Sequence, residues 1–119
     1  VTYGLMFHRC IAAADILKKE GIDVEIIDLR TLSPIDMDTV FESVEQTGRL
    51  VCVDEANPRC SIASDVSANV AQTAFKYLKA PIGMVTAPHT PVPFTPALED
   101  LYIPSPEKIA SVVREVVGA

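Results

Sequence analysis

Residues 28–36, Asp-Leu-Arg-Thr-Leu-Ser-Pro-Ile-Asp, constrain the fold most, because they join segments with two different hydrophobic periods. The run before them contains Val24, Ile26 and Ile27 and has the β-branched character of a strand. After them, apolar residues recur at the i, i+3, i+4, i+7 spacing of one buried helical face: Met37, Val40, Phe41 and Val44. The stretch is therefore predicted to be a strand-to-helix connection.

Local signals predict where this helix begins and ends. Ser33 suits the N-cap, Pro34 suits the first helical position, and Asp36 stands where it would close a capping box. Gly48 suits the position just after the last turn. The pair Ser105–Pro106 repeats the same arrangement before a final helix, so we expect a Ser-Pro pair to start both helices.

The rest of the chain alternates between short apolar runs and helical patterns. We expect strands over residues 1–4, 23–29, 50–53 and 82–86, and helices over 6–20, 36–47, 61–79 and around Ile109, Val112, Val113 and Val116. Such alternation predicts a parallel sheet with helices on both faces and right-handed crossovers. The predicted fold is one α/β domain over 1–119, a three-layer α/β/α, mainly parallel, doubly wound sheet with strand order 2-1-3-4 counted from Val1.

The composition excludes several classes of partner. The chain has 119 residues, 49% of them hydrophobic, and a net charge of −6, which is typical of one globular domain. It has no Lys/Arg cluster for nucleic acid and no apolar run near the ~20 residues of a membrane span. Cys10, Cys52 and Cys60 form no C-x-x-C motif and suit a reducing compartment. The start, Val-Thr-Tyr-Gly, lies inside a strand-like run, so we expect preceding residues to be missing.

Motifs for cofactors and for nucleophilic catalysis are weak. The turn that begins at Gly4 contains no second glycine, as a dinucleotide site would require. Cys60 beside Arg59 at a helix start could act as a nucleophile with His8 or His89, but a small residue packed at a helix start is the favoured interpretation. The two histidines and Cys10 do not have the spacing of a zinc site.

Two acidic residues end the third predicted strand. Asp54 and Glu55 stand at its carboxyl end, next to the predicted switch point where ligands bind in such sheets. A pair of carboxylates could serve as general acid and base. Acids in this position more often cap the next helix or form an ion pair across an interface. We favour an interface role for Glu55.

A proline-rich segment over residues 87–106 is the most unusual part of the chain. It holds six of the nine prolines, and a short helical turn is expected around 97–100. Proline lowers the conformational entropy of the unfolded chain and so favours a stiff loop. The segment is either a strap over the domain's own core or a preformed docking surface with Phe94 and Tyr102 as anchors. These two interpretations are compatible.

Several segments together resemble one family. They are Thr2-Tyr3-Gly4, residues 27–36, the strand end 51–55, Pro91-Val92-Pro93-Phe94, Leu98-Glu99-Asp100 and Ile103-Pro104. In this order and spacing they resemble the C-terminal domain of the beta subunit of 2-oxo acid dehydrogenases, which is similar to the transketolase C-terminal domain. The family comprises the thiamine-diphosphate-dependent first components of the pyruvate, branched-chain and acetoin complexes.

The resemblance implies that the chemistry lies outside this chain. In the family the alpha subunit holds thiamine diphosphate and magnesium, and the activating glutamate lies in the beta subunit's N-terminal pyrimidine-binding domain. That domain and an antiparallel edge strand are expected to be missing here, so no catalytic, cofactor-binding or metal-binding residue is assigned and the fragment alone is expected to be inactive. The implied partners are an alpha subunit and a second beta subunit in an α2β2 heterotetramer, and a lipoyl acyltransferase core. The residues that we expect to bind partners are Glu55, His89, Phe94 and Tyr102.

The expected whole enzyme is a dehydrogenase for pyruvate, with acetoin or a branched-chain 2-oxo acid as alternatives. It would pass an acyl group to lipoyl groups in the bacterial cytoplasm, or in the mitochondrial matrix of a eukaryote. Two departures from the family concern residues 57–61, where many members are glycine-rich, and His89, where many are acidic. Further alternatives are a transketolase C-terminal domain and a free-standing doubly wound binding module, although Tyr3-Gly4-Leu5 lacks the acidic cluster of such a receiver.

Overall fold

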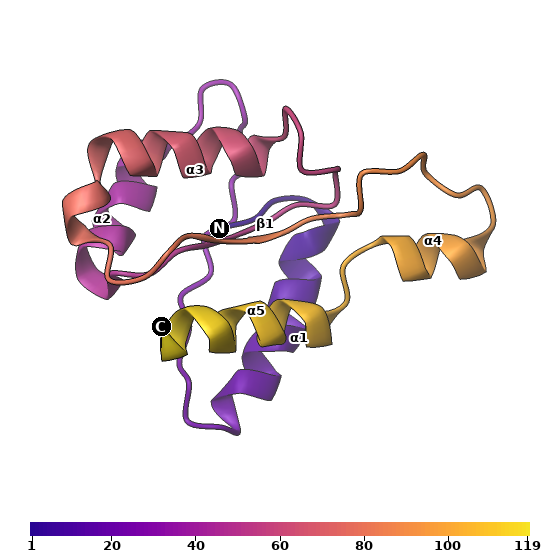
Figure 1. The fold of residues 1–119 in the computed structure, drawn as a ribbon, viewed down its shortest axis with the longest axis horizontal. Helices are drawn as coiled ribbons and strands as arrows, with labels where there is room; N and C mark the ends of the chain where they lie inside the picture. Colours follow the sequence, from indigo (N-terminus) through magenta and orange to yellow (C-terminus); the bar gives the residue numbers. More distant parts are fainter.

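A computed structural model describes residues 1–119. Its elements are α1 (Leu5–Lys18), α2 (Met37–Thr47), β1 (Val51–Val53), α3 (Ile62–Thr73), the 3-10 turn η1 (Phe75–Tyr77), β2 (Gly83–Val85), α4 (Pro96–Tyr102) and α5 (Pro106–Gly118). Helices α2 and α3 lie on one side of the strands and α1 and α5 on the other, while α4 extends away from the body (Figure 1). No helix combines the length and apolar character needed to cross a membrane.

The strands β1 and β2 form a parallel pair. Val51 lies opposite Gly83 and Val53 opposite Val85. Both strands are short, apolar and covered by helices on both faces, as is usual for parallel strands. Because β1 and β2 run in the same direction, the loop after β1 and the segment after β2 leave the sheet at the same end, the carboxyl ends of the strands.

Two further extended segments continue the sheet without forming regular strands: the start of the chain lies beside β1, and the segment around Ile27 lies beyond it. The Val1 amine donates to the Val51 carbonyl at 2.8 Å, and the Thr2 N–H donates to the Ile27 carbonyl at 3.0 Å. The only bridge between the first two predicted strands joins Thr2 to Asp28, so the regular sheet has two strands. The ladder stays short because only Val1 and Thr2 reach between the second segment and β1.

Alternation along β1 divides the core into two clusters. Cys52 belongs to the cluster formed with α2 and α3, whose members include Val40, Val44, Val66 and Val70. Its neighbour Val53 points to the opposite face, where it packs with residues of α1 and α5, including Met6, Leu17, Ile109 and Ala110. The i, i+3, i+4 periodicity seen in the sequence therefore identifies the buried faces of these helices.

The Ser-Pro prediction holds for one helix and is wrong for the other. At α5, the Ser105 hydroxyl accepts from the Lys108 N–H at 3.2 Å, and Pro106 is the first helical residue. At α2, the helix begins at Met37, and Asp36 is the N-cap. Residues 31–35 instead close a turn of their own.

That turn explains why Ser33 does not cap α2. The Thr31 hydroxyl donates to the Pro34 carbonyl at 3.0 Å, and Leu32 forms an antiparallel bridge with Ile35. These local bonds hold Pro34 outside the helix. The Asp36 carboxylate then accepts from the Thr39 hydroxyl at 2.6 Å and from the Thr39 N–H at 3.2 Å. These bonds, the hydroxyl bond above all, hold the pKa of Asp36 below its usual value.

The third helix is shorter than predicted. It ends at Thr73, and Ala74 leaves the helical region with φ −117° before the turn η1. The chain then bends back, so that Tyr77 packs against the α2–α3 cluster and the Lys79 N–H donates to the Gly48 carbonyl at 2.8 Å. Tertiary packing of Tyr77 therefore outweighs the helical pattern over 61–79. Helix α4 confirms the short turn expected around 97–100.

The close approach of α5 to β2 makes Gly83 sensitive to substitution. A Cβ on Gly83 would lie 2.9 Å from methyl groups of both Val112 and Val116, which are stiff, branched side chains. We expect Gly83→Ala to lower the free energy of unfolding by about 1–3 kcal/mol through overpacking. Urea denaturation measures this. The control is Gly118→Ala, where nothing lies within 4 Å of the added Cβ and the change should be small. Equal stability of the two variants would contradict the packing argument.

Candidate partner-binding surface

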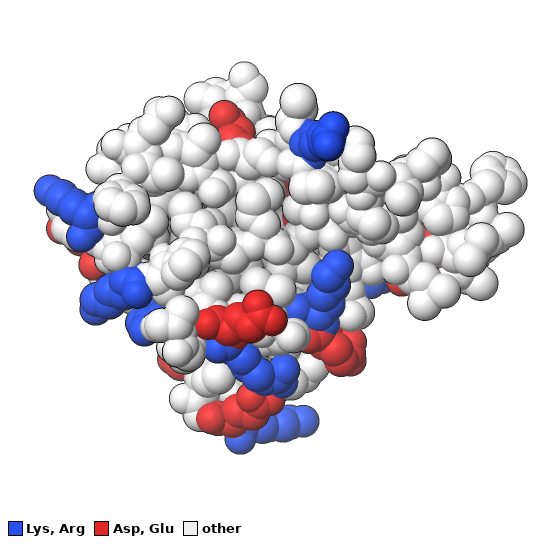
Figure 2. Space-filling model, in the orientation of Figure 1, with Lys and Arg blue, Asp and Glu red and all other residues white.

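Residues 88–102, which we call the arm, present apolar side chains to solvent. Phe94 is 99% exposed and Leu101 is 83% exposed, and Val92 and Leu98 are more than half exposed. The arm carries no Lys or Arg, and its only acidic residues are Glu99 and Asp100. It is the mostly white projection on the right of Figure 2. Apolar side chains exposed together on a projecting segment are typical of a protein-binding surface.

The base of the arm is fixed to the body. Tyr102 is buried, and its hydroxyl donates to the Thr90 carbonyl at 3.4 Å, which joins the two ends of the arm. The Arg9 guanidinium of α1 donates to the Pro104 carbonyl at 2.9 Å, just after the arm. Four prolines restrict the backbone of the arm further: Pro88, Pro91, Pro93 and Pro96. The exposed side chains are thus carried on a well-anchored support.

A buried carboxylate organises the loop that follows β1. Asp54 is only 1% exposed, and one of its oxygens accepts from the Tyr3 hydroxyl at 2.8 Å and from the Ala56 N–H at 2.9 Å. The other oxygen accepts from the Ala63 N–H, in the first turn of α3, at 3.3 Å. Asp54 therefore helps to cap the next helix. This is one of the two structural roles, helix capping or an ion pair across an interface, that the sequence suggests for acids at this position. Ser61 is the N-cap of α3 and accepts from the Ser64 N–H.

The same contact changes the ionisation of Tyr3. Burial of the phenol, followed by its hydrogen bond to the Asp54 carboxylate, raises the pKa of Tyr3 well above its usual value. The neutral phenol is therefore the form that the fold stabilises. No sequence signal pairs Tyr3 with Asp54, because 51 residues separate them in the chain.

The predicted partner-binding residues fall into two groups. Glu55, His89 and Phe94 are all exposed, on the loop after β1 and on the arm. A hydrogen bond of 3.0 Å from the Ala87 N–H to the Ala56 carbonyl joins these two segments where they leave the sheet. Tyr102 instead lies inside its own chain. The exposure of Val92, Leu98 and Leu101 was not predicted from the sequence. The available signal was the i, i+3 spacing of the two leucines, which places them on one face of a helix of only seven residues.

Other candidate chemistry is not assembled. No group of three or more His, Cys, Asp or Glu side chains is placed to hold a metal ion. Cys60 is exposed with φ 53°, and it shares no hydrogen bond with His8 or His89. Cys10 and Cys52 are buried, and burial raises the pKa of the Cys52 thiol to about 11.

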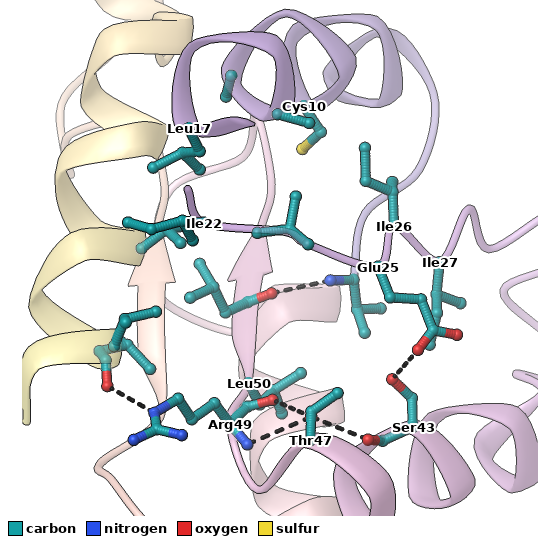
Figure 3. A pocket seen from close by; sticks show the side chains of 18 of the residues that line it. Cys10, Leu17, Ile22, Glu25, Ile26, Ile27, Ser43, Thr47, Arg49 and Leu50 are labelled. Atoms are coloured by element: carbon teal, nitrogen blue, oxygen red, sulfur yellow. Dashed lines mark hydrogen bonds between the residues drawn. The ribbon is translucent and has the colours of Figure 1, made fainter. Parts of the chain in front are cut away.

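An apolar cavity of about 400 Å³ lies at the opposite end of the strands from the loop after β1 and the arm. Its walls come from α1, α2, α5, β1 and the extended residues 21–27, and 18 of its 24 lining residues are hydrophobic (Figure 3). The polar groups at its rim are paired: Ser43 donates to Glu25 at 2.9 Å, and Arg49 donates to the Val116 carbonyl at 3.2 Å.

Comparison with known families identifies the class. Residues 1–109 match the family "Transketolase, C-terminal domain". The chain belongs to this family, which confirms the resemblance drawn from the sequence. A split-gene transketolase described as an inactive beta4 tetramer has the same fold, with a TM-score of 0.83 and 24% identity over 98% of this chain and 37% of that one.

Among curated proteins the chain is similar to the beta subunits of dehydrogenases. It is 68% identical over 117 residues to the acetoin:2,6-dichlorophenolindophenol oxidoreductase subunit beta of Cupriavidus necator, and 53% identical over 115 residues to that of Bacillus subtilis. It is 43% identical over 117 residues to the pyruvate dehydrogenase E1 component subunit beta of Bacillus subtilis. These matches cover 97–98% of this chain but only 34–36% of the relatives, so the chain spans about a third of their length.

The pairing of Tyr3 with Asp54 predicts a dependence of stability on alkaline pH. A tyrosine whose pKa is higher in the folded chain contributes stability that is complete below about pH 10 and is lost as the pH rises above it. We therefore expect the free energy of unfolding to fall as the pH rises above about 10, with a shallower slope for Tyr3→Phe. Chemical denaturation at each pH measures it. Because Cys10 and Cys52 titrate over an overlapping range in both chains, the difference in slope isolates Tyr3. Identical slopes would contradict the assignment.

Proposed function

We propose that this chain is the C-terminal assembly domain of the beta subunit of a thiamine-diphosphate-dependent dehydrogenase of the acetoin and 2-oxo acid class. The observation that carries the proposal is the anchored, exposed apolar arm, which suits a domain that contributes subunit contacts. The identity of 43–68% to beta subunits over almost the whole chain supports the same conclusion. In the intact enzyme the domain holds the subunits in register around active sites built from other parts.

Acetoin is the favoured substrate of that enzyme. The sequence alone favours pyruvate, but identity to the acetoin:2,6-dichlorophenolindophenol oxidoreductase beta subunits is 68% and 53%, against 43% for the pyruvate dehydrogenase beta subunit. With acetoin the enzyme cleaves a carbon–carbon bond; with pyruvate it decarboxylates the acid. In both cases an acyl group passes to a lipoyl group.

The proposed partners are an alpha subunit, a second beta subunit and a lipoyl acyltransferase core, in an α2β2 assembly in the bacterial cytoplasm. Phe94 is the anchor that inserts into a partner, since nearly all of its surface is exposed. Glu55 and His89 supply polar contacts at the rim, where the loop after β1 meets the arm. Tyr102 contributes indirectly, because its bond to Thr90 holds the arm in shape.

The cofactors of the intact enzyme, thiamine diphosphate and magnesium, do not fit any site in this chain. Magnesium prefers several convergent oxygen ligands, and no cluster of acidic side chains is placed to provide them. The turn at Gly4 lacks the further glycines of a diphosphate-binding loop. The resemblance to the family implies that the alpha subunit holds the diphosphate and magnesium, and that a pyrimidine-binding domain of the beta subunit supplies the activating glutamate.

For the intact domain we propose the doubly wound arrangement with strand order 2-1-3-4 and helices on both faces, completed by an antiparallel edge strand. The hydrogen bonds from Thr2 to Ile27 on one side and from Val1 to Val51 on the other support this order. The two core clusters, one with α2 and α3 and one with α1 and α5, support the three layers.

Substitution of Phe94 tests the arm. In the full-length beta subunit, Phe94→Ala should weaken association with the alpha subunit about thirtyfold, the change expected for loss of a hot-spot residue worth about 2 kcal/mol. The thermal unfolding temperature of the beta subunit alone should not change, because Phe94 is 99% exposed. Analytical ultracentrifugation and calorimetry measure the two quantities.

Phe75→Ala is the matched control for this experiment. Phe75 is also an exposed phenylalanine, 71% accessible, but it lies in η1 after α3, at the end of the molecule away from the arm (Figure 1). It should leave association unchanged. If both variants assemble as the unmodified subunit does, the arm is not the contact surface.

The substrate is tested with the reconstituted enzyme. The full-length beta subunit, purified with its alpha subunit, should reduce 2,6-dichlorophenolindophenol with acetoin at a kcat/KM at least tenfold higher than with pyruvate. Dye reduction is followed by absorbance, and 2-oxoisovalerate serves as the branched-chain comparison. A preference for pyruvate would return the assignment to the pyruvate dehydrogenase type and leave the role of this domain in assembly intact.

A further inference from the structure

The short link from α4 to α5, residues 103–105, joins the arm to the body and cannot be held in place by backbone hydrogen bonds alone (Figure 1). Pro104 and Pro106 have no N–H to donate, and the carbonyls of Ile103 and Pro104 accept no backbone hydrogen bond. Pro104 is nonetheless buried, and a buried carbonyl without a donor destabilises a fold. The position of this link therefore depends on a side chain from elsewhere in the chain.

Arg9 of α1 supplies that side chain. Its Nη1 donates to the Pro104 carbonyl at 2.9 Å and to the Ile103 carbonyl at 3.4 Å. Arg9 is the only hydrogen-bond donor to either carbonyl. The side chain is half-buried, and α1 packs against α5 in the same core cluster, so the guanidinium reaches the link from a fixed helix.

The position of the link matters for the arm because α4 is too short to be stable alone. A helix of seven residues is marginal in water and depends on tertiary contacts. The bond from Tyr102 to Thr90 joins the arm to itself rather than to the body. The hydrogen bonds that fix the two ends of the arm to the body are the Ala87–Ala56 bond on one side and the Arg9 bonds on the other.

We propose that Arg9 is a positioning residue for partner binding, which holds the arm in the orientation in which Phe94 meets a partner subunit. This inference rests on the assembly role proposed above. An arm that is ordered before binding loses less conformational entropy on association. Without the Arg9 guanidinium only a fraction of the molecules hold the arm correctly, and the apparent affinity falls by that fraction. Arg9 has this effect without touching the partner.

Hydrogen exchange and association kinetics, measured on the same variants of the full-length beta subunit, test this role. Arg9→Met removes the donors but keeps an unbranched side chain of good helix propensity. In the free subunit, exchange of residues 96–103, followed by mass spectrometry, should be about tenfold faster, as expected when a buried carbonyl loses its donor. Association with the alpha subunit, followed by surface plasmon resonance, should be about tenfold slower, with an unchanged dissociation rate. Arg9→Lys, which keeps a charged donor, should lie between Arg9→Met and the unmodified subunit in both measurements.

Arg49→Met is the matched control. Arg49 also donates from its guanidinium to a carbonyl, that of Val116, but it lies in the wall of the cavity at the opposite end of the strands. This variant should leave exchange of residues 96–103 and association unchanged.

Three results would overturn the role of Arg9. One is unchanged exchange of residues 96–103 in Arg9→Met. Another is faster dissociation in place of slower association, which would place Arg9 in the contact surface itself. The third is faster exchange with normal association, while Phe94→Ala still weakens association. If neither Arg9→Met nor Phe94→Ala alters association, the assembly role of the arm fails, and the inference about Arg9 fails with it.

Discussion

The buried carboxylate of Asp54 is the interaction on which the arrangement of the elements most depends. It receives one hydrogen bond from the first segment of the chain, one from its own loop and one from the first turn of α3. A buried carboxylate without such donors would be very costly, so the three groups must meet at one point. The end of β1, the start of α3 and the strand-like segment at Tyr3 are thereby fixed relative to one another. The loop that carries Glu55 is oriented by the same contact.

Parallel pairing of β1 with β2 then places the two segments proposed to face partners at one end of the strands. The loop after β1 and the arm after β2 leave together, and the Ala87–Ala56 hydrogen bond joins them. The apolar cavity between residues 22–27 and β1 lies at the opposite end of the strands. The segments proposed to contact other subunits are therefore gathered at one end of the strands, away from the cavity.

Much of the fold could be predicted, because local chemistry and tertiary packing agree over most of the chain. The apolar faces of α2 and α5, the Ser105 cap and the turn at Gly48 all follow from spacing and side-chain type. The errors arise where a nearby contact competes with the pattern. Thr31 closes a turn that keeps Pro34 out of α2, and Tyr77 leaves the helical pattern to pack against the α2–α3 cluster. Of the candidate site, Phe94 and Glu55 are exposed as a binding role requires, and that role stays a prediction. The link between Tyr3 and Asp54 could not be predicted, because it depends on a contact across 51 residues.

The exposure of Phe94 and Leu101 has a consequence for the cell as well as for the complex. A subunit that displays these side chains without a partner is prone to non-specific association, and such surfaces are what chaperones and proteases act upon. In the proposed assembly, balanced synthesis of the subunits would therefore matter for solubility as well as for activity. A surplus of this subunit would be removed or would aggregate, so its abundance would follow the supply of its partner.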